Sequence, residues 1–529
     1  MANLKATTVT SGIVSEKIGT TPTDTTVDHK DNLFAGATER AYGYAAMNAE
    51  APRRYQFDPH NSRRFVVVYE NSSAHCKMKI GLISGTEITY SNEYTCTTDI
   101  TRESIFAFDP SVANKLVVSF RDEGGSNYHR ACVGTISALT SDPTGFQLTF
   151  GTEQNVGDYA SDTHWQGDIA FDPSTPGLFS IISQSNSQGY VIAGQVDSSG
   201  TGTTISYGTD SQYPFAQVGG SANDMRLAYN PNTARRFTVV WRDSINTWGF
   251  ARSLDVDSGL FISRSYQYDQ YFYQGDIRWP SIAFDPNTAN KFVISFVKDD
   301  DGDKGVLIVG TQNSGGDISL QQPVASSIFN NAATSYTSVI YDTNTANRVI
   351  VAYEDDADSN KGKAIVGTID YSGPTITSWG SESTFNASGD CYNAHITTDS
   401  SYTGRFIVGW REGSYPNYDA KVITGKIKTE TLSINLTTGS FFTLDMQGVG
   451  ANIDTFTTTG VATGVTVFDL RVIQGSTARQ FDWDYISNVK WPSIPADISA
   501  TTEAVDVYSF TTYDNGTTWY GEIVGQDIK

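Results

Sequence analysis

Arginine, histidine and aromatic side chains stand a few residues before a repeated aromatic-Asp-Pro motif. Aromatic rings stack on the C–H faces of sugars, and arginine or histidine can donate hydrogen bonds to hydroxyl groups. If these segments converge in the fold, they form a binding site for a glycan or another polar receptor. The candidate residues are Arg102, His164, Trp165, Arg226, Arg278, Trp279, Tyr336 and His395.

The motif that these residues precede recurs along most of the chain. Residues 284–296 and 108–120 are nearly the same string, and residues 229–241 are a third copy. Successive copies are 51 to 63 residues apart, and a fixed period of this size indicates a repeat architecture. The first residue of each copy is called its anchor: Phe57, Phe108, Phe171, Tyr229, Phe284, Tyr341 and Thr398.

Each repeat reads as four short antiparallel strands. In the fifth copy, residues 281–284 form an apolar run that ends at an Asp-Pro-Asn-Thr turn, and β-rich runs follow at 291–296 and 305–311. A fourth strand fits in the residues before the next anchor. A four-stranded sheet cannot bury both faces alone, but sheets packed radially cover one another. The sequence therefore predicts an all-β protein with a seven-bladed β-propeller.

In such a propeller the first strand of each blade is innermost. The loops before the first strands and the loops between second and third strands then share one face, near the central channel. The eight candidate residues fall there, together with charged pairs such as Arg121-Asp122, Arg242-Asp243 and Arg411-Glu412. A structural interpretation stays open, in which Trp165 and Trp279 cap blade ends and the Arg–Asp pairs link neighbouring blades.

Acidic loops suggest calcium as the one cofactor to consider. Asp299, Asp301 and Asp303 lie close together and offer the hard oxygen ligands that Ca²⁺ prefers. The loop lacks the twelve-residue EF-hand pattern and its closing glutamate, so a solvated turn is the alternative. We otherwise expect no cofactor.

Composition excludes several classes of partner. The net charge is −22, and such an acidic chain would repel nucleic-acid phosphates. No apolar run approaches the ~18 residues of a membrane span, and the N-terminal residues lack the apolar core of a signal peptide. We therefore expect a protein that is made in a cytoplasm and does not leave it by the general secretory route. The four cysteines form no Cys-x-x-Cys pair, so we expect reduced, buried thiols.

The period stops near residue 428, which predicts three segments. Residues 1–40 are polar and weakly patterned, as expected of an arm that orders against a partner or against the propeller rim. Residues 41–428 form the propeller. Residues 429–529 contain alternating apolar and polar runs with Gly, Asn and Asp turns, which indicates a jelly-roll-like β-sandwich for oligomerisation or attachment.

Enzyme motifs are absent from the sequence. It holds no Gly-x-Ser-x-Gly, no phosphate-binding glycine loop and no His-Glu-x-x-His. Residues 512–519, Thr-Tyr-Asp-Asn-Gly-Thr-Thr-Trp, resemble the Asp-box of sialidases, which in that family is a structural hairpin turn. The resemblance implies a tight hairpin here. A carboxylate pair for glycan hydrolysis stays open, because 58 acidic residues offer many pairs.

Strings near the C-terminus resemble the ends of tail-fibre-like and other virion structural proteins of marine tailed bacteriophages. The matching residues are 468–479, 491–493 and 505–521, with a Gly-Gln-Asp finish at 525–527. The resemblance implies a virion component rather than a defined site. With the predicted propeller face, we expect a virion protein assembled in the host cytoplasm that forms a homo-oligomer, has other virion proteins as partners and binds a host-surface glycan or receptor. The alternatives are a head-decoration or fibre protein without a receptor role, a propeller glycan hydrolase or lyase, and a bacterial surface or scaffold binding module.

Overall fold

The structure is a computed structural model in which the chain forms two compact units, residues 28–427 and residues 1–27 with 428–529. It describes residues 17–18, 33–34, 37, 39–45 and 54–528, apart from 62, 85–86, 125–127, 157–164, 186–187, 198–201, 216–221, 266–268, 344, 389, 401–403, 415–416, 428–429, 447–452, 477–480, 482–485, 487, 493–497 and 500. Within these residues, no helix has the length and hydropathy of a membrane span.

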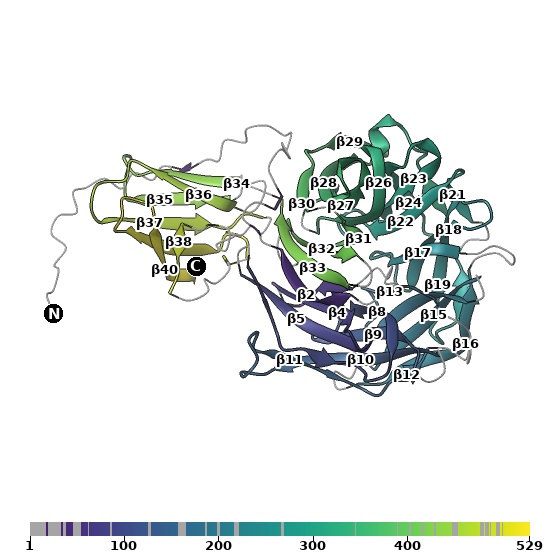
Figure 1. Ribbon diagram of the computed structural model, residues 1–529. Helices are drawn as coiled ribbons and strands as arrows, with labels where there is room; N and C mark the ends of the chain where they lie inside the picture. Colours follow the sequence, from purple (N-terminus) through teal and green to yellow (C-terminus); the bar gives the residue numbers. More distant parts are fainter. Residues whose placement is uncertain are drawn as a thin grey trace. The chain divides into compact units, whose positions relative to one another are not determined.

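The larger unit is all-β, and its sheets surround a common centre in a propeller-like arrangement (Figure 1). Five sheets are separate. The first sheet contains β3 (Tyr55–Phe57), β4 (Arg64–Glu70), β5 (Cys76–Ser84), β6 (Glu87–Tyr90) and β7 (Tyr94–Thr95), and the second contains β8 (Thr101–Phe108), β9 (Lys115–Asp122), β10 (Tyr128–Ala138), β11 (Phe146–Phe150) and β12 (Gln154–Asn155). The third contains β13 (Trp165–Phe171), β14 (Leu178–Ser185), β15 (Gln188–Val196) and β16 (Ile205–Pro214), and the fourth contains β17 (Ala222–Tyr229), β18 (Arg236–Asp243), β19 (Gly249–Val256), β20 (Ile262–Arg264) and β21 (Gln270–Tyr273). The sheet of the last repeat contains β31 (Tyr392–Thr398), β32 (Arg405–Ser414) and β33 (Asn417–Lys426) together with β2 (Arg40–Ala45).

The number of separate blades differs from the predicted seven, because the fifth and sixth repeats share one nine-stranded sheet. Its members are β22 (Ile277–Phe284), β23 (Lys291–Lys298), β24 (Lys304–Gln312), β25 (Ile318–Leu320), β26 (Ile328–Tyr341), β27 (Arg348–Asp355), β28 (Lys361–Asp370), β29 (Thr375–Trp379) and β30 (Ser383–Asn386), with the 3₁₀ turns η1 (Asp299–Asp301), η2 (Ala325–Ser327) and η3 (Asp356–Asp358). Strand β26 is 14 residues long. It pairs with β24 at its start and with β27 over its second half, so it serves both repeats.

The strands that end at the anchors form the wall of the centre. These inner strands are β3, β8, β13, β17, β22, β26 and β31. Each contacts the inner strand of the next repeat, and β31 contacts β3. The inner strands therefore close into a ring, as the propeller prediction requires.

The N-terminal part of the chain takes part in both units. Strand β2 pairs with β33 and so completes the sheet of the last repeat. Leu33 and Phe34 are buried against Phe385 and Phe406 of that region. Strand β1 (Lys17–Ile18) pairs instead with β35 of the smaller unit.

The smaller unit contains two sheets around one core. The larger sheet has the order β1–β35 (Phe441–Asp445)–β37 (Thr466–Ile473)–β39 (Val505–Thr512)–β40 (Trp519–Ile528)–β38 (Val489–Lys490), and β34 (Glu430–Asn435) pairs with β36 (Ile453–Thr459). Phe456 stacks on Phe468 and Phe510 across the core. The pairs β1–β35, β35–β37, β38–β40 and β34–β36 are parallel, whereas β37–β39 and β39–β40 are antiparallel, so the pairing in this unit is mixed.

A buried aspartate or asparagine follows every anchor, and several of these residues hydrogen-bond to a neighbouring repeat. The Asp172 carboxylate accepts the Ser174 N–H at 2.9 Å within its own turn and the Arg235 N–H of the next repeat at 2.7 Å. Asp109 binds the Gly177 N–H in the same way at 3.0 Å. The residue six positions after each anchor has a φ of +59° to +75°: Arg63, Asn114, Gly177, Arg235, Asn290, Asn347 and Gly404. In Arg63, Gly177, Arg235 and Asn290 the N–H donates to a side chain of the neighbouring repeat.

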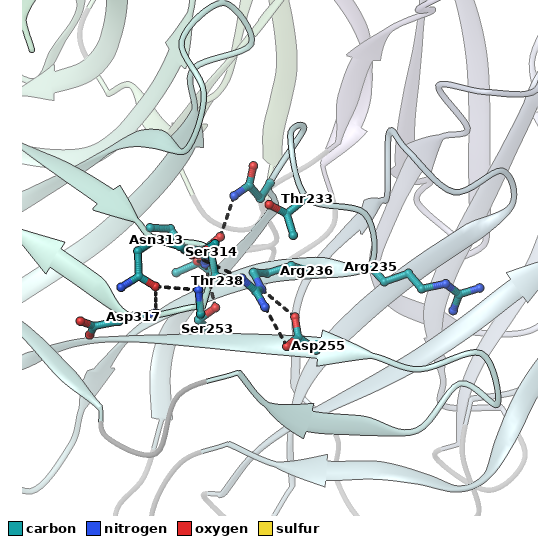
Figure 2. Close-up of polar contacts among 12 residues, drawn as sticks. Thr233, Arg235, Arg236, Thr238, Ser253, Asp255, Asn313, Ser314 and Asp317 are labelled. Carbon is teal, nitrogen blue, oxygen red and sulfur yellow. Dashed lines mark hydrogen bonds and ion pairs between the residues drawn. The ribbon is translucent and has the colours of Figure 1, made fainter.

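Polar side chains fill out the seam between the fourth and fifth repeats (Figure 2). The buried Gln312 accepts a hydrogen bond from Asn230 at 2.7 Å and donates to Thr238 and Ser253 at 3.0 and 2.7 Å. Beside it, Arg236 pairs with Asp255 and donates to the Ser314 carbonyl at 2.8 Å. Because every one of these groups has a partner, the seam can be buried without an unsatisfied donor.

We predict that Asp172→Ala destabilises the larger unit by about 1–3 kcal/mol, because it removes the acceptor of two part-buried N–H groups, one of them from the next repeat. Chemical denaturation followed by intrinsic fluorescence measures this loss. Asp257→Ala is the matched control, since Asp257 makes a similar turn with Gly259 and Phe261 on the exposed surface. Equal losses in the two variants would contradict a role of Asp172 in joining repeats.

Candidate functional site

The inner strands carry a β-bulge at matching positions. The residue five positions before the anchor has a positive φ in five repeats: Glu103, Asp224, Trp279, Tyr336 and Asn393, at +46° to +57°. The pairing register shifts at the same place, for example between Arg278 and Ser281 and between Ser335 and Ser338. Bulges re-aim side chains, and a bulky residue adopts positive φ only at an energetic cost. The bulge is therefore a common feature of the repeats, and its backbone conformation does not require an aromatic side chain.

Three aromatic side chains on adjacent inner strands form a contiguous surface, which we call the aromatic arc: Trp279 on β22, Tyr336 on β26 and Tyr392 on β31. The ring centroids of Trp279 and Tyr336 are 4.6 Å apart at 44°, and those of Tyr336 and Tyr392 are 6.3 Å apart at 81°. The Thr337 hydroxyl donates to the Trp279 carbonyl at 2.9 Å and ties two of these strands together. All three rings are partly exposed, so a ligand can reach them.

An arginine lies at each end of the aromatic arc. The Arg278 guanidinium is 5.8 Å from the Trp279 ring centroid, and the Arg411 guanidinium is 5.4 Å from the Tyr392 centroid. The Arg278 side chain is 45% exposed and pairs with Asp299 at 2.8 Å. The arc therefore offers stacking surfaces flanked by hydrogen-bond donors.

A group of carboxyls lies behind the arc. The Ser335 hydroxyl, next to Tyr336, donates to Asp356 at 2.8 Å. Glu354 is only 4% exposed, and burial raises its pKa to about 9, with further increases from Asp356 and Asp390 and an opposing effect of Arg411. At neutral pH the Glu354 carboxyl is thus protonated, and it hydrogen-bonds to Asp356.

The centre of the ring contains a cavity of about 220 Å³. Arg226 and His395 line it, together with Asp168, Ser281 and Ser338. Asp168 accepts the Leu227 N–H at 3.0 Å, and Ser281 and Ser338 accept N–H groups of the next repeats at 3.2 Å. Much of the polar lining therefore holds the inner strands together.

The structure brings together only part of the predicted site. Arg278, Trp279 and Tyr336 meet in the arc, whereas Arg226 and His395 lie in the cavity. Arg102 pairs with Glu123 at 2.5 Å in the second repeat. The remaining two cannot be placed. His164 lies outside the described residues, and Trp165 begins β13 with a side chain that the structure does not describe.

Sequence reasoning missed Tyr392 as a site residue and placed Arg411 only among the charged loops. Tyr392 stands six positions before its anchor, whereas Trp279 and Tyr336 stand five before theirs. A search for aromatic residues within one position of the bulge would have found it.

Other charged residues form pairs that link neighbouring repeats, as the structural interpretation of the charged loops predicts. Arg242 pairs with Asp276 at 3.1 Å, which links the fourth repeat to the chain that enters the fifth. Glu70 pairs with Arg54 at 2.9 Å and accepts the Ser104 N–H of the second repeat at 2.7 Å. These pairs hold neighbouring repeats together.

The predicted calcium ligands do not form a cluster. Asp299 pairs with Arg278, and Asp301 lies between the ammonium groups of Lys298 and Lys304 at 3.0 and 3.1 Å. Across the described part of the chain, no group of three His, Cys, Asp or Glu side chains could hold a metal ion. Burial raises the pKa of the Asp299 carboxyl, and Asp303, which lies beside it, raises this pKa further.

The segment that resembles an Asp-box is a hairpin turn between β39 and β40. The Asp514 carboxylate accepts the Thr512 hydroxyl and the Thr518 N–H, both at 2.8 Å, and Trp519 is buried in the core. These bonds fix the turn and lower the pKa of Asp514. The interpretation as a structural hairpin is confirmed.

Comparison with known proteins gives similarity to solved structures alone. No family model and no curated protein matches the chain. The BP39L lectin of Burkholderia pseudomallei is 8% identical with a TM-score of 0.49, over 72% of this chain and 99% of the lectin. A mutant NanB sialidase of Streptococcus pneumoniae is 10% identical with a TM-score of 0.41, over 75% and 71%. A Dyadobacter fermentans protein of unknown function is 11% identical with a TM-score of 0.37, over 73% and 99%. At scores below 0.5, these similarities carry no information on what this chain binds.

We predict that Glu354 makes the larger unit less stable as pH rises. Between the ordinary glutamate pKa and about 9, the folded chain holds a proton that the unfolded chain has released. Stability therefore falls through this window, by up to about 1.4 kcal/mol per pH unit. Glu354→Gln should remove this slope in denaturation series at pH 5 to 9.

The exposed Glu87 provides the control for this series. Glu87→Gln should keep the wild-type dependence on pH, because its carboxyl lies on the surface and pairs only with Arg40. A wild-type stability that stays level or rises between pH 5 and 9, relative to Glu354→Gln, would contradict a buried, protonated Glu354.

Proposed function

We propose that the larger unit is a glycan-binding module whose ligand stacks on the aromatic arc. The observation that carries this proposal is the contiguous, partly exposed surface of Trp279, Tyr336 and Tyr392 with an arginine at each end. Sugar rings present C–H faces to aromatic rings and hydroxyl groups to donors at their edges. The arc supplies both in one place.

The backbone supports a role in binding. Trp279 and Tyr336 both have a positive φ, and Asn393, next to Tyr392, has it as well. Residues held in this region are costly and collect at ligand-binding sites, because the strain positions a side chain in advance. The bulges fix the arc before a ligand arrives, so little conformational entropy is lost on binding.

The carboxyls near the arc favour binding over hydrolysis. Glycosidases place their two catalytic carboxyls about 5–9.5 Å apart, on either side of the scissile bond. Glu354 and Asp356 instead hydrogen-bond to each other, and Glu354 is buried. We therefore propose a binding protein, with a glycan hydrolase or lyase as the second candidate.

We further propose that this binding serves host attachment by a virion. Its support is the resemblance of residues 468–479 and 505–521 to the ends of phage virion proteins. Mass spectrometry of purified particles and antibody labelling in electron micrographs test this setting. Label on tail appendages would support attachment, and label on heads would support a decoration protein. Absence of the chain from particles would overturn the virion proposal and leave glycan binding to be judged separately.

We predict that Trp279→Ala lowers affinity for glycans at least tenfold, because stacking on one arc ring is lost. Wild-type chain is first screened on a glycan array, and the best ligand is then measured by calorimetry with each variant. Sugar release is assayed in the same samples. Released sugar would favour the enzyme candidate over the binder.

Trp379→Ala is the matched control for this experiment. Trp379 is also half-buried, but it lies on β29, outside the ring of inner strands, and donates to the Ser326 carbonyl at 2.9 Å. It should affect stability and leave affinity unchanged. Unchanged glycan affinity in folded Trp279→Ala and Tyr336→Ala would overturn the arc as the binding site.

A further inference from the structure

Three of the four cysteines meet at the seam between the first two repeats. Cys76 lies on β5, Cys96 directly follows β7, and Cys132 lies on β10. The Cys96 and Cys132 sulfur atoms are 3.2 Å apart, although the residues are 36 positions apart in the chain. This is a contact between thiols from two different repeats.

Cys76 is the second neighbour of Cys96. The Cys96 N–H donates to the Cys76 carbonyl at 3.0 Å, and the adjacent pair Lys77 and Thr95 fixes the same antiparallel register. Cys96 therefore lies between two thiols, one in its own repeat and one in the next.

The seam differs from ordinary packing of cysteine as a small apolar residue. Cys76 and Cys132 are fully buried in a hydrophobic cluster with Phe106 and Phe120, whereas Cys96 is partly exposed at its edge. Cys96 is therefore the least buried of the three thiol residues and the one that we expect an oxidant to attack first. Cys391, the fourth cysteine, is buried in a different cluster.

We propose that Cys96 and Cys132 are a disulfide site that closes under oxidising conditions and links the first repeat to the second. The sulfur atoms need to approach by about 1 Å to reach the ~2.05 Å of a disulfide bond. Side-chain rotation at the partly exposed Cys96 supplies this movement. Cys76 is the alternative partner of Cys96, so the bond can move between a link within the first repeat and a link across the seam.

The oxidant belongs to the class of low-molecular-weight disulfides, such as oxidised glutathione. The Cys96 thiolate attacks one sulfur of the oxidant, forms a mixed disulfide and releases one small thiol. The Cys132 thiolate then attacks the Cys96 sulfur and releases the second small thiol. The two protein thiols lose two protons and two electrons, and the oxidant becomes two thiols.

Closure of the bond constrains the unfolded chain and holds two repeats together. A cross-link between distant positions lowers the entropy of the unfolded state, and it is reversed by reductants. The larger unit is then more resistant to unfolding in an oxidising environment than in a reducing cytoplasm. This property is independent of the proposed glycan site, which lies on β22, β26 and β31.

The test uses the full chain, purified under reducing conditions and then exposed to oxidised glutathione. Free thiols are counted, linked peptides are mapped by mass spectrometry without reductant, and thermal unfolding is recorded. Wild type should lose two of its four thiols, yield a peptide pair that joins Cys96 to Cys132, and unfold a few degrees higher than the reduced chain.

Four serine variants make the assignment specific. Cys96→Ser should lose no thiols and gain no stability from oxidation, Cys132→Ser should link Cys76 to Cys96, and Cys76→Ser should still link Cys96 to Cys132. Cys391→Ser is the matched control and should behave as wild type. Circular dichroism of each reduced variant establishes that it is folded. A lasting glutathione adduct on Cys96 without a linked peptide, or equal thiol loss in Cys96→Ser, would overturn the proposal.

The pH dependence of closure gives a second readout. The neighbouring thiols and burial raise the pKa of Cys96 well above its ordinary value. Because the thiolate is the reacting form, the closure rate should rise about tenfold per pH unit with no plateau up to pH 9. A plateau below pH 8 would contradict attack by Cys96 in this environment.

Discussion

The buried aspartate or asparagine after each anchor is the interaction on which the ring depends. The fold places a polar side chain where no water can reach, and each residue has partners that compensate for the lost hydration. Asp172 shows both, one N–H from its own turn and one from the next repeat. A turn that forms locally therefore carries the acceptor for its neighbour, and the Arg235 backbone must adopt a positive φ to reach it. The same side chain is therefore needed both to form the local turn and to assemble the ring.

The same inner strands that this ring holds in place also carry the bulges, and the site uses them. A bulge interrupts the backbone hydrogen bonding between the first and second strands at the end away from the anchor turn, and it changes the direction of the side chains there. In the second repeat this position is Glu103, in the fifth it is Trp279 and in the sixth Tyr336. A common backbone feature thus presents different side chains around the ring. The proposed binding site lies where neighbouring repeats place aromatic residues on adjacent strands.

Patterns confined to one repeat were predictable from the sequence, and relations between repeats were not. The Asp285-Pro286 turn and the Asp514 hairpin follow from turn chemistry, and both are present. The shared strand β26 was missed because residues 328–341 continue from one repeat into the next without a turn signal. An analysis based on a fixed repeat period divides this continuous strand in two. Burial of Phe34 was missed because a short apolar pair in a polar stretch has no period. Tyr392 was missed because the bulge offsets it by one position.

Charge explains what kind of recognition the arc can perform. The chain as a whole is strongly acidic, with a net charge of −22, yet the arc has arginines at both ends. Asp299 neutralises Arg278, and the proton on Glu354 removes a negative charge close to Arg411. The local charges therefore largely cancel, and long-range attraction contributes little to binding. Affinity then comes from stacking and short-range hydrogen bonds, so the arrangement of hydroxyl groups on the ligand, rather than its charge, should decide which glycan binds.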